Sequence, residues 1–351
     1  MNQRLSIAFS AWLKEQRKKY RLTQTELARR IHCASITIRK IEAGERRPST
    51  QLAELLADYF AIPMQERYAF LHFARTDEPP HYSLPEPRSL PFSVDAAAIY
   101  LMEANTGSVL VNQNAQEPLP IASTTKIMTT LVALEHGDLE QCITIPQETT
   151  DRVQRCGGYT IGLRAGDQLS LKELLYALML ASGDEVALII GEAVGGTLPA
   201  FVRLMNQYAQ RLGLKKTHYL TPGAIIHPAL VMSAAGEQHY STAEDLVRLA
   251  RHAQTNPLFA QIVQLQRYQI HETALHQAYT WETTNSLLSS YPGATGIKTG
   301  HSTDAGYCLV FSATSGKHHL IGAILQASAG ERRDQDARRL LDWGFHVLTQ
   351  P

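Results

Sequence analysis

The sequence predicts two fold classes in one chain: an all-α domain at residues 1–75 and an α/β (α+β) domain at residues 93–351. Three observations carry this prediction. The first 75 residues show only short helical patterns, whereas strand and helix patterns mix from Ser93 onward. Residues 76–92 contain five prolines, which fix φ, remove donors and predict an extended linker. A length of 351 residues also suits two domains.

The net charge of zero hides an asymmetry between the two predicted domains. Residues 1–75 hold 14 Lys and Arg against 7 Asp and Glu, and the rest of the chain holds 19 against 26. We call the basic domain at residues 1–75 the head and the acidic domain at residues 93–351 the body. The excess of basic residues indicates that the head binds a polyanion. The basic residues that directly follow Leu5–Leu13 argue against a secretion signal, and no apolar run has membrane-spanning length. We therefore expect a cytoplasmic protein with no membrane partner.

The head shows the start and stop signals of two short helices. Thr23 and Glu26 form an S/T-x-x-E capping box at the start of the first helix. Ser35 is expected to cap the second helix, whose Ile38 and Ile41 face inward, and Gly44 to end it. Two short helices at this spacing, the second carrying polar and basic outward residues, suit a helix-turn-helix that enters a DNA major groove.

The segments TQTELARRI and SITIRKIEAGERRPS resemble the lambda-repressor-like (XRE) family over about residues 9–73. The resemblance implies binding of double-stranded DNA, with a homodimer on a repeated or palindromic site. The alternative is a helical bundle whose solvated basic face binds a protein. The DNA-binding residues that the resemblance and the outward face of the second helix indicate are Gln24, Ser35, Ile36, Thr37, Arg39, Lys40 and Arg46.

The body begins with a hairpin pattern, in which two apolar runs flank the Asn105–Gly107 turn. Two further strands are expected on either side of Ser315 and Gly316, followed by a closing helix at 331–348. Between the hairpin and these strands, helical patterns cover residues 123–136, 170–182 and 184–194.

Three short motifs in the body carry chemistry. In Ser123-Thr-Thr-Lys126, residues i and i+3 lie on one helix face, so a deprotonated lysine can activate the serine as a nucleophile. Ser182-Gly-Asp184 follows an apolar helix, and Lys298-Thr-Gly300 precedes a strand. In the third motif, Lys and Thr can bind a carboxylate, and Gly leaves room for a substrate backbone on an edge strand.

Each motif alone is a weak signal, because a Ser-Lys pair is usually a solvated surface and KTG is common in turns. Their order, with separations of 59 and 116 residues, is the signature of penicillin-recognising serine enzymes. The surrounding segments resemble the low-molecular-mass D-alanyl-D-alanine carboxypeptidases (peptidase S11 type) over about residues 94–348. The resemblance implies a β-lactamase/transpeptidase-like fold, in which helices cover an antiparallel sheet and the active site lies between the sheet and a helical lobe.

The resemblance also implies the reaction: acyl transfer from a peptide ending in D-Ala-D-Ala, or from a β-lactam. Ser123 would be the nucleophile, Lys126 the general base and Ser182 the proton relay. Lys298 and Thr299, followed by Gly300, would hold the substrate carboxylate, and the amides of Ser123 and His301 would form the oxyanion hole.

Asp184 departs from the family pattern, which usually has asparagine there. Ionised aspartate donates no hydrogen bond and favours protonated lysines nearby, so we expect slow acylation unless its side chain turns away. Two hypotheses therefore remain open: a working DD-carboxypeptidase that the head localises or regulates, and a transcription regulator whose peptidase domain senses such peptides or β-lactams. We expect no metal and no cofactor, and most of the 14 histidines on the surface or in loops.

Overall fold

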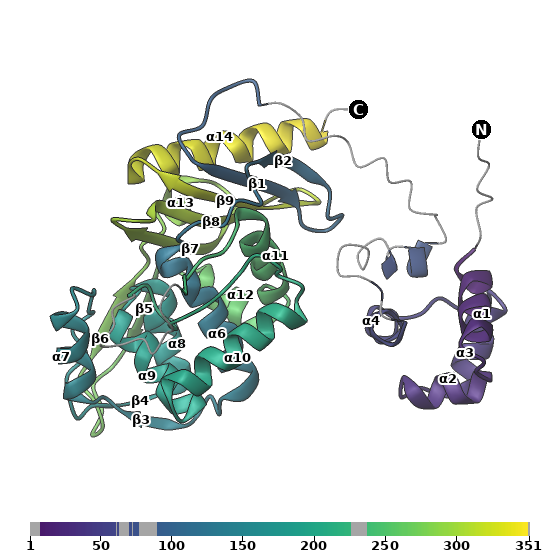
Figure 1. Cartoon of the computed structure of the whole chain (residues 1–351), viewed down its shortest axis with the longest axis horizontal. Coiled ribbons are helices and arrows are strands. Elements are labelled where there is room, and N and C mark those ends of the chain that lie inside the picture. The colour runs from purple at the N-terminus through teal and green to yellow at the C-terminus, as the bar shows by residue number, and fades with distance from the viewer. Residues whose placement is uncertain are drawn as a thin grey trace. The chain divides into compact units, whose positions relative to one another are not determined.

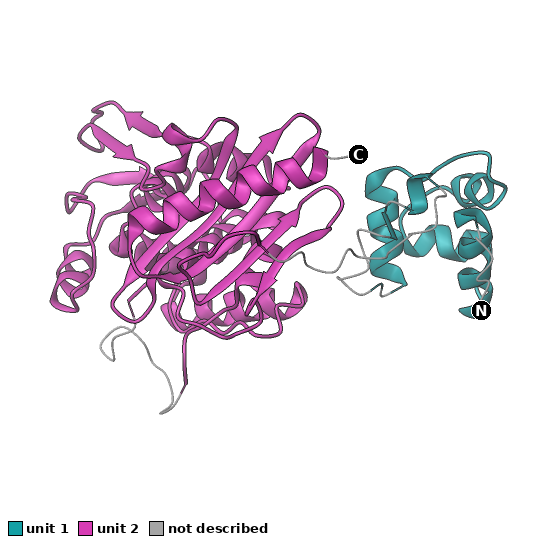
Figure 2. Cartoon of the chain, turned by 90° about the horizontal axis from the view of Figure 1, so that it is seen from above, with its two compact units in different colours: residues 1–85 teal, residues 86–351 magenta. Residues whose placement is uncertain are grey.

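The computed structural model describes residues 8–60, 62, 70–71, 73–76, 90–225 and 237–349. The chain divides into two compact units, residues 1–85 and 86–351 (Figure 2). The division falls within the predicted 76–92 linker, of which residues 77–89 lie outside the described residues. Leu90 and Phe92, at the end of that predicted linker, pack against the core of the larger unit because both side chains are apolar.

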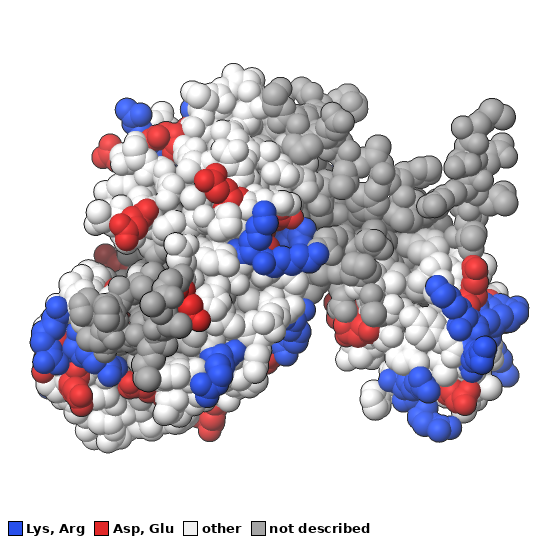
Figure 3. Space-filling view, in the orientation of Figure 1, with Lys and Arg blue, Asp and Glu red and all other residues white. Residues whose placement is uncertain are grey.

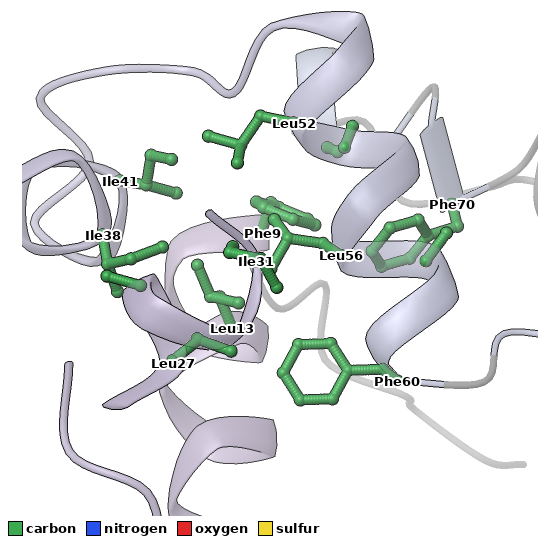
Figure 4. Packing of buried hydrophobic residues seen from close by; sticks show 14 of the residues in the cluster. Phe9, Leu13, Leu27, Ile31, Ile38, Ile41, Leu52, Leu56, Phe60 and Phe70 are labelled. Atoms are coloured by element: carbon green, nitrogen blue, oxygen red, sulfur yellow. The ribbon is translucent and has the colours of Figure 1, made fainter. Parts of the chain in front are cut away.

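The smaller unit is helical, and its helices bury their apolar sides in one core (Figure 4). Ile38 and Ile41 face this core as predicted, and the Thr23–Glu26 capping box forms with both of its bonds. The prediction that Ser35 caps the second helix is wrong, because that helix begins at Ser35 and Ala34 is its N-cap. The described helices are α1 (Phe9–Lys19), α2 (Gln24–Arg30), α3 (Ser35–Glu42) and α4 (Thr50–Tyr59).

The larger unit is built on a five-stranded antiparallel sheet in the order β2-β1-β9-β8-β7. Both predicted hairpins are confirmed, as β1–β2 and β8–β9. The strands are β1 (Ala98–Glu103), β2 (Val109–Gln113), β7 (Ala294–Ser302), β8 (Gly306–Ser315) and β9 (His318–Ala327).

Helices lie on both faces of the sheet (Figure 1), and successive side chains of a strand point to opposite faces. Leu309 and Phe311 of β8 pack with the closing helix α14 (Gly330–Thr349). Ser312, on the opposite face, accepts a hydrogen bond from Gln254, which follows α11 (Ala243–Ala253). The sheet is therefore covered on both faces, as the resemblance implied.

The helical lobe carries two of the three motifs. Its central helix α6 is buried from Lys126 to Ala133 and contacts α8, α9, α10 and α11. No single helix among the described residues is long and apolar enough to span a membrane. The bent pair α9 and α10, taken together, has the length and composition of a span. The remaining elements are η1 (Ala122–Thr125), α6 (Lys126–His136), β3 (Cys142–Thr144), α7 (Gln147–Arg155), β4 (Gln168–Ser170), α8 (Leu171–Leu180), α9 (Asp184–Gly195), α10 (Leu198–Arg211), α12 (Pro257–Val263), β5 (Arg267–Ile270), β6 (Tyr279–Glu282) and α13 (Leu287–Ser290).

Candidate active site

The first motif forms the turn that leads into α6. Ser123 lies in the 3₁₀ helix η1 rather than on the predicted α-helix, and Lys126 is the first residue of α6. Because residues i and i+3 eclipse in a 3₁₀ helix, the two side chains still meet. Lys126 Nζ lies 3.0 Å from Ser123 Oγ. The lysine is completely buried, so bulk water does not compete for this contact.

Ser182 reaches the same lysine from the junction between α8 and α9. Lys126 Nζ lies 3.3 Å from Ser182 Oγ and donates to the Ser182 carbonyl oxygen at 2.6 Å. The φ of Ser182 is 66°, in the left-handed region, which costs an L-residue about 1–2 kcal/mol. This conformation allows one residue to present both its hydroxyl and its carbonyl to Lys126.

Asp184 faces Lys126 and does not turn away. Its Oδ1 lies 2.7 Å from Lys126 Nζ, and the side chain is almost completely buried. The carboxylate also accepts from the backbone amides of Tyr159 at 3.1 Å and Ala224 at 3.3 Å. Contacts from three directions therefore hold Asp184 in place, and the alternative in which it points elsewhere is excluded.

The surroundings of Lys126 Nζ define what the amine can do. Ser182 O and Asp184 Oδ1 can only accept, so a neutral amine would give them its two hydrogens and turn its lone pair toward Ser123 Oγ. An ammonium ion would satisfy the same oxygens and have no lone pair. The geometry therefore suits a base, and it also places the carboxylate of Asp184 2.7 Å from the amine.

The third motif lies on the edge strand β7, next to η1. Lys298 is 1% exposed and donates to the carbonyl of Thr299 at 3.2 Å. Burial, together with the positive charge of Lys126, lowers the pKa of Lys298 well below its ordinary value of 10.5. The Thr299 hydroxyl shares a hydrogen bond with the hydroxyl of Thr284, and the His301 ring stacks on Tyr307.

Gly300 is required for a reason that differs from the predicted one. A Cβ atom at this position would lie 2.9 Å from the carbonyl oxygen of Ile121 and 3.2 Å from the amide nitrogen of Ser123. The missing side chain therefore lets β7 approach the backbone of the nucleophile turn. The sequence-based expectation was that this space would be left for a substrate backbone.

Two protein families match this chain. The D-alanyl-D-alanine carboxypeptidase family of peptidase S11 matches residues 85–329, and a helix-turn-helix family matches residues 13–67. The chain belongs to the peptidase S11 D-alanyl-D-alanine carboxypeptidase family. It also carries an N-terminal helix-turn-helix domain.

Relatives of this S11 chain align over most of its length. A D-alanyl-D-alanine carboxypeptidase of Streptomyces sp. (strain K15) is 33% identical over 265 residues, which cover 72% of this chain and 88% of the relative. The carboxypeptidase DacF of Bacillus subtilis is 31% identical over 254 residues, 72% of this chain and 62% of its own length. The crystal structure of the Streptomyces K15 DD-transpeptidase matches with a TM-score of 0.68 and 33% identity, covering 74% of this chain and all of that one.

The S11 site contains polar residues that the motifs did not indicate. Glu185 is buried and accepts from the amide of Ile161 at 2.7 Å, and its Oε2 has no hydrogen-bond partner among the described residues. Burial raises the pKa of Glu185 above its ordinary value of 4.5. A short sequence motif could not indicate these residues, because they contact the site through backbone amides or through residues distant in sequence. They are Tyr159, Glu185 and Thr284.

The predicted DNA-binding residues lie on α2, α3 and the turn after α3, and Figure 3 shows Lys and Arg side chains gathered on this unit. Gln24 is held by the structure itself, because its side-chain amide donates to Glu42 at 2.7 Å. Glu42 also pairs with Arg17 at 2.6 Å, a network that the sequence did not reveal. Thr37 is half-buried, and the exposed residues are Ser35, Ile36, Arg39, Lys40 and Arg46.

The described residues contain no group of three or more His, Cys, Asp or Glu that could hold a metal ion. Most histidines were expected on the surface or in loops, and His239 lies in a loop but is only 6% exposed.

Proposed function

We propose that this protein is a cytoplasmic serine-type D-Ala-D-Ala carboxypeptidase that works slowly and carries a DNA-binding head. The observation that carries the proposal is the position of Lys126 Nζ within hydrogen-bonding distance of both Ser123 Oγ and Ser182 Oγ. A buried lysine between two hydroxyls can take a proton from one and return it through the other.

Acylation begins when Ser123 Oγ attacks the carbonyl of the penultimate D-Ala while its proton moves to Lys126 Nζ. The oxygen of the tetrahedral intermediate accepts hydrogen bonds from the amides of Ser123 and His301, which stabilise it by several kcal/mol. Ser182 passes a proton to the nitrogen of the terminal D-Ala. The C–N bond then breaks, and water later hydrolyses the ester on Ser123.

Lys298 and Thr299 supply the site for the terminal carboxylate of the substrate. Lys298 is buried and, among the described residues, bonds the Thr299 carbonyl, so an incoming carboxylate would supply its ammonium form with a directly bonded charge partner. A β-lactam carries a carboxylate and a reactive carbonyl, and would acylate Ser123 in the same way. Turnover is slow in this proposal because Asp184 favours the ammonium form of Lys126.

The head is proposed to bind double-stranded DNA as a homodimer. The second candidate function is a transcription regulator in which the S11 domain senses D-Ala-D-Ala peptides or β-lactams. The buried Lys126–Asp184 ion pair favours this alternative, because an ammonium ion cannot accept the Ser123 proton. The complete set of Ser123, Lys126, Ser182 and Lys298 around one site favours the enzyme.

The test is labelling with a fluorescent penicillin, followed by intact mass of the wild type and Ser123→Ala. We expect one adduct in the wild type and none in Ser123→Ala. An adduct that is hydrolysed within minutes, with release of D-Ala from a D-Ala-D-Ala peptide, supports the enzyme. An adduct that persists without D-Ala release supports the sensor, and no adduct at all contradicts both uses of Ser123.

A further inference from the structure

We propose that His239 is a positioning residue for acylation: its imidazole holds the turn that carries Ser123 and Lys126 by donating to the Thr125 hydroxyl. His239 belongs to neither a catalytic motif nor a described helix or strand. Its Nε2 lies 2.7 Å from Thr125 Oγ1, although 114 residues separate the two in sequence. Thr125 is the last residue of η1, directly before Lys126, and is completely buried. The inference rests on the proposed function.

The tautomer of His239 follows from its second contact. The backbone N–H of Leu220 points to His239 Nδ1 at 3.1 Å, and a backbone amide can only donate. Nδ1 therefore accepts, so the proton of the neutral ring lies on Nε2, which donates to Thr125. Burial, followed by the charge of His218, lowers the pKa of His239 to about 3, so the ring stays neutral at physiological pH.

The segment around His239 is anchored on both of its sides. Tyr240 pairs with His218 through two backbone hydrogen bonds of 2.9 and 3.0 Å. Ser241 pairs in the same way with Leu119, at 2.8 and 3.1 Å. The segment 239–241 therefore holds the nucleophile turn at two points, Leu119 before Ser123 and Thr125 after it. Loss of the imidazole would release only the second point.

Loss of this contact should slow acylation without weakening the non-covalent binding of the ligand. The contact holds the nucleophile turn, whereas the side chains of Lys298 and Thr299 bond the Thr299 carbonyl and the Thr284 hydroxyl, not His239 or Thr125. We therefore expect His239→Ala to lower the acylation rate constant for a fluorescent penicillin at least tenfold, with little change in the dissociation constant of the non-covalent complex. Thr125→Val should have the same effect, and the double variant should be no slower than either single one.

Two conservative variants separate the two ring nitrogens. His239→Gln places an amide donor near the position of Nε2, and His239→Asn places an acceptor near that of Nδ1. We expect Gln to restore the rate constant to within about threefold of the wild type and Asn to remain as slow as Ala. Rescue by Asn and not by Gln would overturn the proposal, because the bond to Leu220 would then be the one that matters.

Thr124→Val is the matched control for the pairwise coupling. It removes a buried hydroxyl from the same turn, one that donates to the Ile121 carbonyl at 2.7 Å and does not touch His239. The fold-decreases in acylation rate constant caused by Thr124→Val and by His239→Ala should multiply in the double variant. Those caused by Thr125→Val and by His239→Ala should not multiply, because both remove the same contact. Multiplication in both pairs would overturn the proposal. Thermal unfolding of each variant shows whether it folds.

The failure of this inference is distinguishable from the failure of the proposed function. Labelling of the wild type tests the proposed function. If its acylation is too slow to time, the ratios of the acylation rate constants are measured with each variant made in an Asp184→Asn background. The imidazole contact also has a readout that needs no acylation: ¹⁵N chemical shifts of the His239 ring at pH 7. A neutral Nε2–H tautomer supports the contact, and a protonated ring or an Nδ1–H tautomer overturns it, whether or not Ser123 is acylated.

Discussion

Asp184 is an acidic neighbour of both lysines of the site. Its carboxylate lies beside Lys126 at 2.7 Å, and its negative charge also opposes the loss of charge at Lys298. An asparagine at the same place could make the same contact through its oxygen and donate through its nitrogen. The two residues therefore differ in one buried charge, in one donated hydrogen bond, and in the bond that Oδ2 accepts from the Tyr159 amide at 3.1 Å.

We expect Asp184→Asn to acylate faster than the wild type, by about tenfold or more, because it removes a buried charge that favours the ammonium form of Lys126. Stopped-flow fluorescence with a labelled penicillin measures the rate. Asp245→Asn is a matched control, because this buried aspartate bonds the Lys216 amide and Thr217 instead of a catalytic residue. An Asp184→Asn variant as slow as the wild type would contradict this account of the aspartate.

Lys298 makes carboxylate binding depend on pH. Because its pKa lies well below 10.5 in the free protein, the ammonium form is lost as pH rises through that lower value. A D-Ala-D-Ala peptide needs the ammonium form, so its affinity should fall with rising pH from below 10.5, by up to tenfold per pH unit. Calorimetry on Ser123→Ala, which binds without acylation, measures this. Lys298→Gln should bind weakly and without this dependence, and an equal slope in both would contradict the assignment.

At the scale of elements, the backbone is strained at the α8–α9 junction and at the start of η1, the two places that carry Ser182 and Ser123. Ser182 adopts a φ of 66°, and Ala122, directly before the nucleophile, adopts 44°. Strained backbone at a reactive site persists only where the surrounding structure holds it. Here the packing of α6 against α8 and α9 holds it.

Ser182→Gly and Ser182→Ala form a matched pair that tests this strain. Both lose the hydroxyl and should lose acylation to the same extent. Only glycine relieves the left-handed backbone, so Ser182→Gly should be more stable than Ser182→Ala by about 1 kcal/mol. Thermal unfolding of the larger unit measures the difference. Equal stabilities would mean that the positive φ carries little cost at this junction.

The elements also show which features the sequence could predict. The hairpins, the capping box at Thr23 and the three motifs were predictable because each is local, or has a fixed spacing with a chemical meaning. The contact of His239 with Thr125 and that of Arg17 with Glu42 join residues that are distant in sequence. The η1 turn at Ser123 and the packing role of Gly300 depend on how β7 meets η1, which no single segment encodes.

At the scale of the whole molecule, two units with separate cores share one chain. The helix-turn-helix carries exposed basic residues, and the S11 unit carries the catalytic set. Each unit can therefore bind its ligand through its own residues. A functional link between them requires that ligand binding at one site changes the affinity at the other.

Acylation should leave DNA affinity unchanged if the protein is the enzyme that we propose. The measurement is fluorescence anisotropy of a selected double-stranded operator, at fixed salt because phosphate contacts make affinity depend on salt. Wild type and Ser123→Ala are compared with and without saturating penicillin, and Kd is expected to agree within about twofold in all four states. A change of about fivefold or more that occurs only in the wild type would be a coupling of about 1 kcal/mol between the sites. Such a change would favour the regulator, because a covalent event at Ser123 would then alter how the head binds its operator.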